Sequence, residues 1–256
     1  MKKILKLYKK MSETPLECLE RFRKENPEYA EVKMTYAGRL DPMAEGELLV
    51  LVGEECKNKE AYLGLDKEYE MDILFGFSTD TYDILGLLEK NWDLEGPKSY
   101  DIAGHGGKVK RFLEKMVGEH EQEYPSFSSK TIKGKQLFQI AKDGELEDHI
   151  LPTKNVKIYE NELLKNYFIK GRELKGDIMK RVLAVQGDFR QEEILKRWEK
   201  ILKGQGDTQF LVSTIRVKCS GGVYMRNIAV ELGKFLGIPA LALKIKRTKI
   251  FDTNNK

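Results

Sequence analysis

Several stretches of the chain alternate hydrophobic and polar residues, a pattern typical of strands with one buried face. Residues 67–75 alternate most regularly, with Tyr69 on the apolar side and Leu74 as the exception. Similar alternation, or a short apolar run, predicts further strands at 48–52, 210–219 and 241–251.

Other stretches repeat their apolar residues every three or four positions, which is the spacing of an amphipathic helix. This spacing predicts helices over 109–117, 194–202 and 224–235. An earlier helix has signals at both ends. Thr14 is a predicted N-cap with Glu17 completing a capping box, Pro15 suits the first turn, and Asn26 followed by Pro27 ends the helix.

The predicted strands and helices are mixed, without the regular strand–helix rhythm of a doubly wound sheet. Residues 76–107 and 142–155 are rich in Gly, Asp and Lys, and we expect them to be loops. The highly charged stretch of about 160–207 is expected to be an inserted helical element. Because no linker is evident, we expect a single domain over residues 1–256.

The overall charge is close to balanced. The chain has 256 residues, with 45 Lys and Arg against 41 Asp and Glu, and a formal net charge of +4. This excludes a histone-like polycation and allows nucleic-acid binding only where positive charge is concentrated on one face. No uncharged stretch approaches the roughly 18 apolar residues that span a bilayer.

The cysteines and histidines indicate the cellular location of the protein and whether it binds a metal. The cysteines (Cys18, Cys56 and Cys219) are odd in number and widely spaced, so we expect no disulfide framework and a reducing, cytoplasmic location. The three histidines are also scattered, and there is no CxxC, HxxxH or HExxH motif. We therefore expect no bound metal.

One acidic residue stands in an unusual local setting. Gly38 and Gly46 flank a tight loop that carries Arg39, Asp41 and Pro42, directly before a predicted buried strand. Loops held on rigid strands often carry catalytic residues. The spacing alone leaves two interpretations open: a catalytic carboxylate, or a carboxylate that caps the turn by accepting a backbone N–H.

This loop, Gly38-Arg39-Leu40-Asp41-Pro42 with Ala44 and Gly46, resembles the signature loop of the TruB family of tRNA pseudouridine synthases. Other segments resemble further motifs of that family and occur in the family's order. They are Lys9–Thr14, Lys67–Tyr69, Thr79–Gly86, Pro125–Lys130 with Gly134-Lys135, Cys219–Arg226 with Leu232-Gly233, and Ile245–Thr248. Any one of these segments is weak evidence, but together and in order they are strong.

The resemblance implies an α/β fold of the α+β kind, the pseudouridine synthase fold, with a curved, mixed and mostly antiparallel sheet flanked by helices. It also implies an isomerase that converts uridine to pseudouridine in the T loop of tRNA, at position 55 of the tRNA. In this reaction the N1–C1′ bond breaks and C5 bonds to C1′. No redox cofactor or energy source is needed, so we expect no cofactor.

The family motifs also imply roles for individual residues. Asp41 would be the catalytic carboxylate and Arg226 its ion partner. Tyr69 would stack on the flipped base and help to remove the C5 proton. Tyr36 stands where bacterial members usually have a His that helps to extrude the target nucleotide, and we expect it to wedge or stack there.

We expect further residues to bind the substrate. Lys9 would support the catalytic loop, and Tyr224 would form a wall of the pocket. The remaining candidates are Arg39, Lys130, Ile245 and Arg247. Basic residues near both ends of the chain and at 130–135, Arg247 among them, would supply the positive surface that phosphate contacts need.

The expected partner is tRNA, bound through its T arm by a monomer. The chain stops just after the last family motif, so we expect no C-terminal PUA-type domain. One alternative is an RNA-binding, tRNA-folding protein of the same fold with weak or no catalysis. Another is an acid–base enzyme such as a glycosidase, which the lack of a second well-placed carboxylate motif disfavours. A guide-RNA-dependent role is disfavoured because those relatives carry the PUA-type domain.

Overall fold

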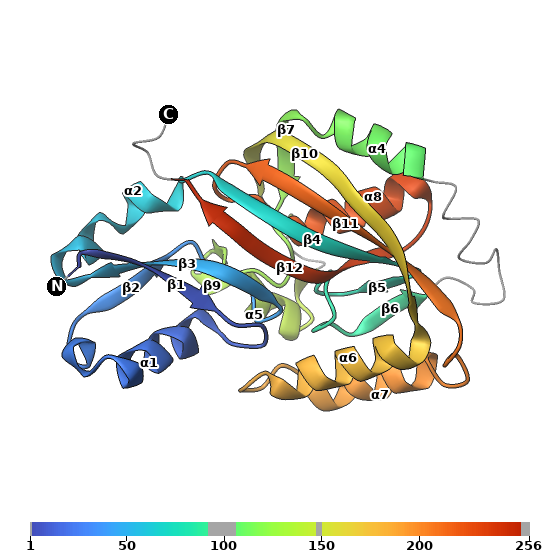
Figure 1. Cartoon of the computed structure of the whole chain (residues 1–256), viewed down its shortest axis with the longest axis horizontal. Helices are drawn as coiled ribbons and strands as arrows, with labels where there is room; N and C mark the ends of the chain where they lie inside the picture. The colour runs from blue at the N-terminus through green and yellow to red at the C-terminus, as the bar shows by residue number, and fades with distance from the viewer. Residues whose placement is uncertain (1, 92–105, 147–149, 252–256) are drawn as a thin grey trace.

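The computed structural model describes residues 2–91, 106–146 and 150–251, and these are built around one large sheet (Figure 1). Its strands are β1 (Ile4–Lys9), β2 (Met34–Ala37), β3 (Ala44–Val52), β4 (Lys67–Phe75), β7 (Gly118–Glu123), β10 (Thr153–Lys170), β11 (Gln209–Cys219) and β12 (Ala240–Ile250). The strand order is β1–β3–β12–β4–β11–β10–β7, and β2 also pairs with β3. Neighbouring strands are antiparallel except β3 and β12, which are parallel. The expected mixed, mostly antiparallel sheet is confirmed.

Helices α4 (Gly106–Lys115) and α8 (Met225–Leu236) cover one face of this sheet (Figure 1). Apolar residues of β4, β11 and β12 pack against these helices in the largest hydrophobic cluster. Its members include Met71 of β4, Ile215 of β11 and Ile228 of α8. Strand β4 begins and ends where the alternation predicts, and it places Tyr69 in this cluster. The regular alternation of apolar and polar residues in β4 therefore corresponds to a strand that is buried mainly on one side.

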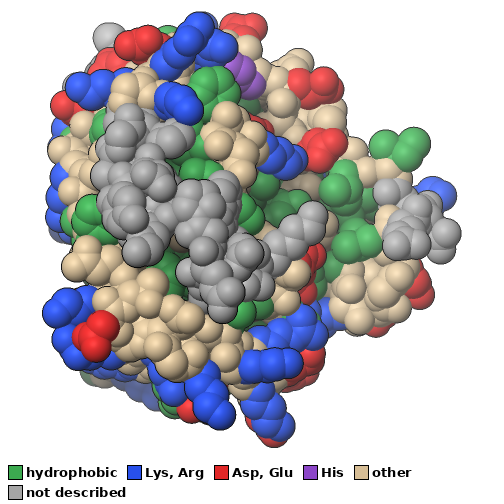
Figure 2. Space-filling model, turned by 90° about the vertical axis from the view of Figure 1, so that its right-hand side faces the viewer, with side chains coloured by type: hydrophobic (Ala, Val, Ile, Leu, Met, Phe, Trp, Pro, Cys, Tyr) green, Lys and Arg blue, Asp and Glu red, His purple; other side chains and the backbone are tan. Residues whose placement is uncertain are grey.

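Helices α6 (Gly171–Ala184) and α7 (Gln191–Ile201) cover the opposite face and form the second cluster. Leu174 and Trp198 from these helices are fully buried there together with Leu74 of β4. This explains why Leu74 breaks the alternation of its strand, because the end of β4 is buried on both faces. Lys and Arg side chains gather on the outer side of this helix pair, at the lower end of the face in Figure 2.

The N-terminal helix α1 (Pro15–Glu25) forms as predicted. The Thr14 hydroxyl accepts the Glu17 N–H at 3.2 Å, and the Glu17 carboxylate accepts the Thr14 N–H at 2.6 Å. The buried Cys18 and Leu19 of α1 pack against apolar residues of β3. The segments that follow are η1 (Pro27–Tyr29), η2 (Gly53–Asn58) and α2 (Lys59–Leu63).

The two expected loops contain more structure than their composition indicates. Within 76–107, β5 (Phe77–Thr79) pairs with β6 (Leu88–Asn91) as a separate small sheet, and residues 92–105 lie outside the described part. The loop expected at 142–155 ends at Thr153, where β10 begins. Smaller elements lie between the two: β8 (Thr131–Ile132), β9 (Lys135–Gln136) and α5 (Leu137–Lys142).

The helical element expected at 160–207 is wrong at its start. Residues 160–170 continue β10, which pairs with β11 from Ile158 opposite Cys219 to Lys170 opposite Gln209. None of the residues in this stretch is fully buried, and its polar and apolar residues do not alternate in the way that predicts a strand. Only residues 171–201 carry the two helices. None of the helices in the described part of the chain is both long enough and apolar enough to span a membrane.

Candidate active site

Asp41 lies in the loop between β2 and β3, and its carboxylate meets the guanidinium of Arg226. The distance from Arg226 Nε to Asp41 Oδ2 is 2.8 Å, and the two side chains are 3% and 33% exposed, respectively. The turn itself is closed by the backbone, because the Asp41 carbonyl accepts the Ala44 N–H at 3.0 Å. The carboxylate is therefore paired with a buried cation while a third of its side chain remains open to a ligand.

Arg226 lies in the first turn of α8 and is held by two other loops. Its Nη1 donates to the Thr81 carbonyl at 2.5 Å, and its Nη2 donates to the Phe127 carbonyl at 3.2 Å. The carboxylate of Asp83, which is buried, lies 3.9 Å from Arg226 Nε. Burial alone would lower the pKa of Arg226, but the charges of Asp41 and Asp83 raise it above its usual value. The guanidinium is thus a fixed cation whose plane is set by two carbonyls.

Lys9, at the end of β1, is fully buried beneath the loop that carries Asp41. Its Nζ donates to the carbonyls of Lys10 at 2.9 Å, Pro42 at 3.4 Å and Glu13. Burial lowers the pKa of Lys9 to about 8, although the charges of Glu13 and Asp41 partly oppose this. Lys9 lies where a residue supporting the Asp41 loop is expected, and it does not contribute to the basic surface.

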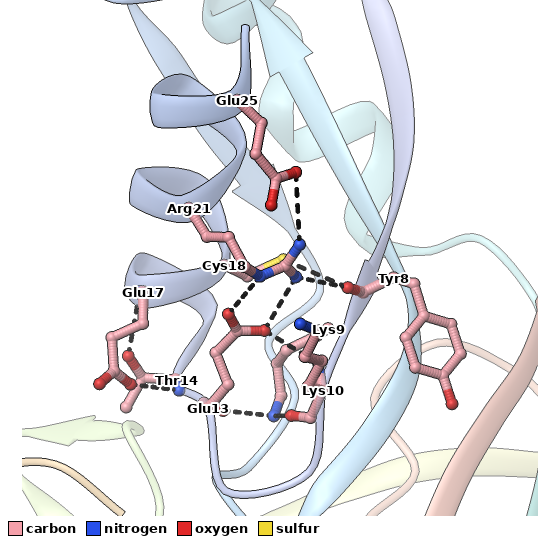
Figure 3. A network of polar contacts seen from close by, with 9 residues as sticks. All are labelled: Tyr8, Lys9, Lys10, Glu13, Thr14, Glu17, Cys18, Arg21 and Glu25. Atoms are coloured by element: carbon pink, nitrogen blue, oxygen red, sulfur yellow. Dashed lines mark hydrogen bonds and ion pairs between the residues drawn. The ribbon is translucent and has the colours of Figure 1, made fainter.

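A clamp on α1 holds the segment around Lys9 (Figure 3). The Arg21 guanidinium binds both carboxylate oxygens of Glu13, at 2.8 and 3.1 Å, and also donates to the Tyr8 carbonyl at 2.8 Å. The other side of this segment meets the Asp41 loop directly, since the Ser12 N–H donates to the Pro42 carbonyl at 2.9 Å. The N-terminal strand and α1 therefore fix the backbone that follows Asp41.

Tyr69 lies on β4 directly opposite Arg247 of β12 and is 7% exposed. Burial raises the pKa of Tyr69, and the nearby Asp41 charge raises it further, while Arg247 acts in the opposite direction. The phenol therefore stays protonated at neutral pH. Leu40 and Ala44, which flank Asp41 in its loop, pack in the same hydrophobic cluster as Tyr69, so the structure places Tyr69 beside that loop.

Arg247 and Ile245 point into the protein rather than toward solvent. Arg247 is 1% exposed and donates from Nε to the Glu47 carbonyl at 2.6 Å and from Nη2 to the Gly38 carbonyl at 3.1 Å. The expectation that Arg247 belongs to a basic surface is therefore corrected: it anchors the backbone that precedes Asp41. Ile245 packs in the same core cluster as Tyr69. Alternation within β12 already indicated the buried position, because Arg247 is two residues after Ile245.

Tyr224 precedes α8 and is also part of the neighbourhood of Asp41. The side-chain amide of Gln122 accepts the Tyr224 N–H at 2.8 Å and donates to its carbonyl at 3.3 Å, which fixes the start of α8. Burial raises the pKa of Tyr224, and the Asp41 charge adds to this. The Tyr224 ring packs edge-on against Tyr124, with centroids 5.6 Å apart, and the exposed Lys130 lies 5.1 Å from the Tyr124 ring.

Tyr36 and Arg39 lie on the β2 side of the same loop. The exposed Arg39 donates from Nη2 to the Tyr36 hydroxyl at 3.3 Å. The ammonium group of Lys59 lies 5.6 Å from the centroid of the Tyr36 ring. These contacts place Tyr36 in a half-buried cationic setting at the edge of the loop, and they do not link it to the Asp41 carboxylate.

The sequence predicted no role for Thr81, for Asp83 or for the backbone carbonyl of Phe127, although each residue lies inside a segment that resembles a family motif. Those motifs could have pointed to these residues. Thr81 and Phe127, however, bind Arg226 through their backbone carbonyls, and a backbone contact does not depend on which side chain the residue carries. In the described ranges, no cluster of three or more His, Cys, Asp or Glu residues is arranged to hold a metal ion.

Comparison with protein families gives one match that spans much of the chain. The model of the "TruB family pseudouridylate synthase (N terminal domain)" matches residues 26–178, which include Asp41 and Tyr69. A tRNA pseudouridine synthase B of Aquifex aeolicus is 27% identical over 218 residues, covering 85% of this chain and 58% of the relative. That of Caldanaerobacter subterraneus subsp. tengcongensis is 35% identical over 224 residues, covering 88% of this chain and 61% of the relative.

Among solved structures, the fold is similar to a chain in the crystal structure of a Cbf5-Nop10-Gar1 complex. The TM-score is 0.53 at 17% sequence identity, and the match covers 96% of this chain and 48% of that chain. At this identity the likeness shows the fold. The chain spans about six tenths of the length of the curated relatives described above.

Proposed function

Because the chain belongs to the TruB family of pseudouridylate synthases, we propose that it isomerises uridine to pseudouridine in tRNA. The proposed target is the T-loop uridine at position 55 of the tRNA, reached through the T arm by a monomer. The observation that carries the proposal is the pair of Asp41 and Arg226, a partly open carboxylate fixed at 2.8 Å by a buried guanidinium.

The chemistry needs a carboxylate near C1′ and the base, but no external reactant. The N1–C1′ bond of uridine breaks, C5 bonds to C1′, and the proton lost from C5 is balanced by the proton gained at N1. Asp41 supplies the carboxylate, either as a nucleophile or by assisting cleavage of the glycosidic bond. Arg226 keeps that carboxylate in one direction, since its own position is fixed by two carbonyls.

A uridine within a folded T loop must leave its stack before Asp41 can reach it. Tyr224, which is half-buried two residues before Arg226, is proposed to offer ring surface against which an extruded base could pack. Tyr69 is 7% exposed, and we propose that it meets the base with the small part of its side chain that remains open. Burial raises the pKa of Tyr69, so its hydroxyl is protonated at neutral pH. We therefore assign it a relay role, in which it accepts the C5 proton only as it gives up its own proton. Tyr36 and Arg39, with Lys130 at the outer edge, are proposed to contact the surrounding RNA.

The proposal is tested by incubating the purified protein with an unmodified tRNA transcript and mapping pseudouridine by carbodiimide-induced reverse-transcription stops. Asp41→Asn keeps the shape of the side chain and removes its charge, and we expect it to reduce product formation at least about 10³-fold. Asp207→Asn is the matched control, because the Asp207 side chain is 84% exposed and pairs with the exposed Arg172 at the surface. Full activity of Asp41→Asn would refute the assignment of the carboxylate.

Binding of tRNA is measured in the same samples. The proposed isomerase requires that wild type and Asp41→Asn bind tRNA with similar affinity and differ in product. If wild type binds tRNA tightly and forms no pseudouridine in any transcript, the alternative of an RNA-folding protein is favoured instead.

A further inference from the structure

Arg190 immediately precedes α7 and reaches two loops that are distant in sequence. Its Nη1 and Nη2 lie 2.6 and 3.3 Å from the two carboxylate oxygens of Asp80, which makes the ion pair bidentate. The same guanidinium lies over the ring of Phe127, 4.5 Å from its centroid. The side chains of Arg190 and Asp80 are 22% and 19% exposed, so water screens this pair less than a surface pair.

The two loops that Arg190 joins are the loops that hold Arg226. Asp80 is followed directly by Thr81, whose carbonyl accepts a hydrogen bond from Nη1 of Arg226. The Phe127 ring contacts Arg190, and the Phe127 carbonyl accepts Nη2 of Arg226. One arginine therefore sets the relative position of the two carbonyls that orient another arginine.

Asp80 is also oriented from its other side. Its Oδ1 accepts the Leu87 N–H at 2.8 Å, and its own N–H donates to the Leu87 carbonyl at 3.1 Å. The Asp80 carboxylate is thus fixed to the small β5–β6 sheet, while Arg190 connects it to Phe127. If Arg190 were lost, Asp80 would keep its place and the Phe127 loop would lose its tie to it.

We propose that Arg190 is a positioning residue for the pair of Asp41 and Arg226. It acts by fixing the positions of the Thr81 and Phe127 carbonyls relative to each other. The inference rests on the proposed function only where it concerns turnover of RNA. The helical segment 171–201 then contributes to the site through Arg190, and not only to the core through its apolar face. Because Arg190 acts through Arg226, its effect falls on the rate of the chemical step and not on tRNA affinity.

The first test compares Arg190→Gln with wild type in kcat and KM for tRNA. We expect kcat to fall by about 10- to 100-fold, because small misplacements of a catalytic group have effects of that size, and KM to stay within about twofold. Arg172→Gln is the matched control: Arg172 lies in the same helix pair, on α6, and forms an exposed ion pair with Asp207 at 2.9 Å. Arg190→Lys keeps the charge opposite Asp80 but loses the flat stacking surface, so it should recover part of the rate.

A double-variant cycle tests whether Arg190 and Asp80 act as one unit. The combination of Asp80→Asn and Arg190→Gln should lose no more rate than the more severe of the two single variants. Losses that multiply would show that the two residues act independently and would overturn the proposal. Thermal unfolding of each variant identifies those that fail to fold, and Arg190→Lys then replaces Arg190→Gln.

A measurement that does not depend on catalysis is the NMR signal of the Arg226 Nε–H group. Arg190→Gln should shift this signal and speed its exchange with water, whereas Arg172→Gln should leave it unchanged. An unchanged Arg226 signal in Arg190→Gln, or a raised KM with unchanged kcat, would overturn the positioning role. If the Arg226 signal responds while wild type forms no pseudouridine, the positioning role stands and the proposed function fails.

Discussion

Gly46→Ala is expected to destabilise the protein severely, because Gly46 is where β3 meets its only parallel neighbour in the described sheet. An ideal Cβ at Gly46 would lie 2.1 Å from the carbonyl oxygen of Arg247, 2.8 Å from its carbonyl carbon and 2.9 Å from its nitrogen. All three atoms belong to the backbone of β12, so no side-chain rotation can relieve the overlap. The parallel pairing covers only Ala44–Gly46 against Ile245–Arg247, and moving β12 away would break it.

The size of the loss is set by two costs. Gly46 has φ +114°, a conformation that strains any other residue by roughly 1–3 kcal/mol. Forcing an added methyl group into a packed interior costs about another 1–3 kcal/mol. Gly53→Ala separates the two costs, since Gly53 directly follows the same strand, has φ +62° and has no atom within 4 Å of an added Cβ. Gly53→Ala should therefore lose only about 1–2 kcal/mol.

Urea unfolding followed by circular dichroism gives the free energy of unfolding of both variants. We expect Gly46→Ala to be less stable than Gly53→Ala by about 1–3 kcal/mol, with the same dependence on urea concentration in both. Equal losses would refute the reasoning, because they would show that β12 accommodates the methyl group. Gly46→Ala should also be impaired in activity where it remains folded, since displacement of Arg247 loosens the Gly38 carbonyl before Asp41.

Two further predictions concern buried cations of the site. Burial lowers the pKa of Lys9 from 10.5 to about 8 in the folded protein. Between pH 8 and 10.5 the unfolded chain therefore binds more protons than the folded one. The stability of wild type relative to Lys9→Met should accordingly rise as pH rises through that range. Urea titrations at several pH values measure this gain, which is at most about 3 kcal/mol, and a difference that does not vary with pH would contradict it. Arg226→Lys keeps the charge but cannot reach Asp41, Thr81 and Phe127 together, so single-turnover pseudouridine formation should fall about 100-fold with tRNA binding retained. A rate near that of wild type would show that charge alone suffices.

The sequence predicted the elements whose own residues determine them. The capping box at Thr14 and Glu17 needs only a short segment, and the alternation of β4 reports burial that the strand has along its whole length. The segment 160–170 behaves differently, because none of its residues is fully buried and its polar and apolar residues do not alternate. There β10 is held by its backbone pairing with β11. A strand that depends on its partner cannot be recognised from its own apolar pattern.

The same distinction applies to the site. The pairing of Asp41 with Arg226 could be predicted from the family motifs, although the two residues are far apart in sequence. The alternation of β12 indicates that Arg247 is buried, but the Glu47 and Gly38 carbonyls that accept its hydrogen bonds are seen only in the fold. The contact of Arg190 with Asp80 and Phe127 joins segments with no shared pattern, and only the folded chain reveals it.

The loop that carries Asp41 is held by buried cations on both of its sides. Arg247 binds the Gly38 carbonyl before Asp41, and Lys9 reaches the Pro42 carbonyl directly after it. Each cation is buried, and a buried charge is costly unless polar partners satisfy it, so the backbone carbonyls stabilise the cations as much as the cations fix the loop. A loop fixed in this way needs little reorganisation when a substrate arrives, which is the condition under which a positioned carboxylate contributes most to a rate. Substitutions at Lys9 or Arg247 should therefore slow the proposed reaction even though neither side chain is exposed.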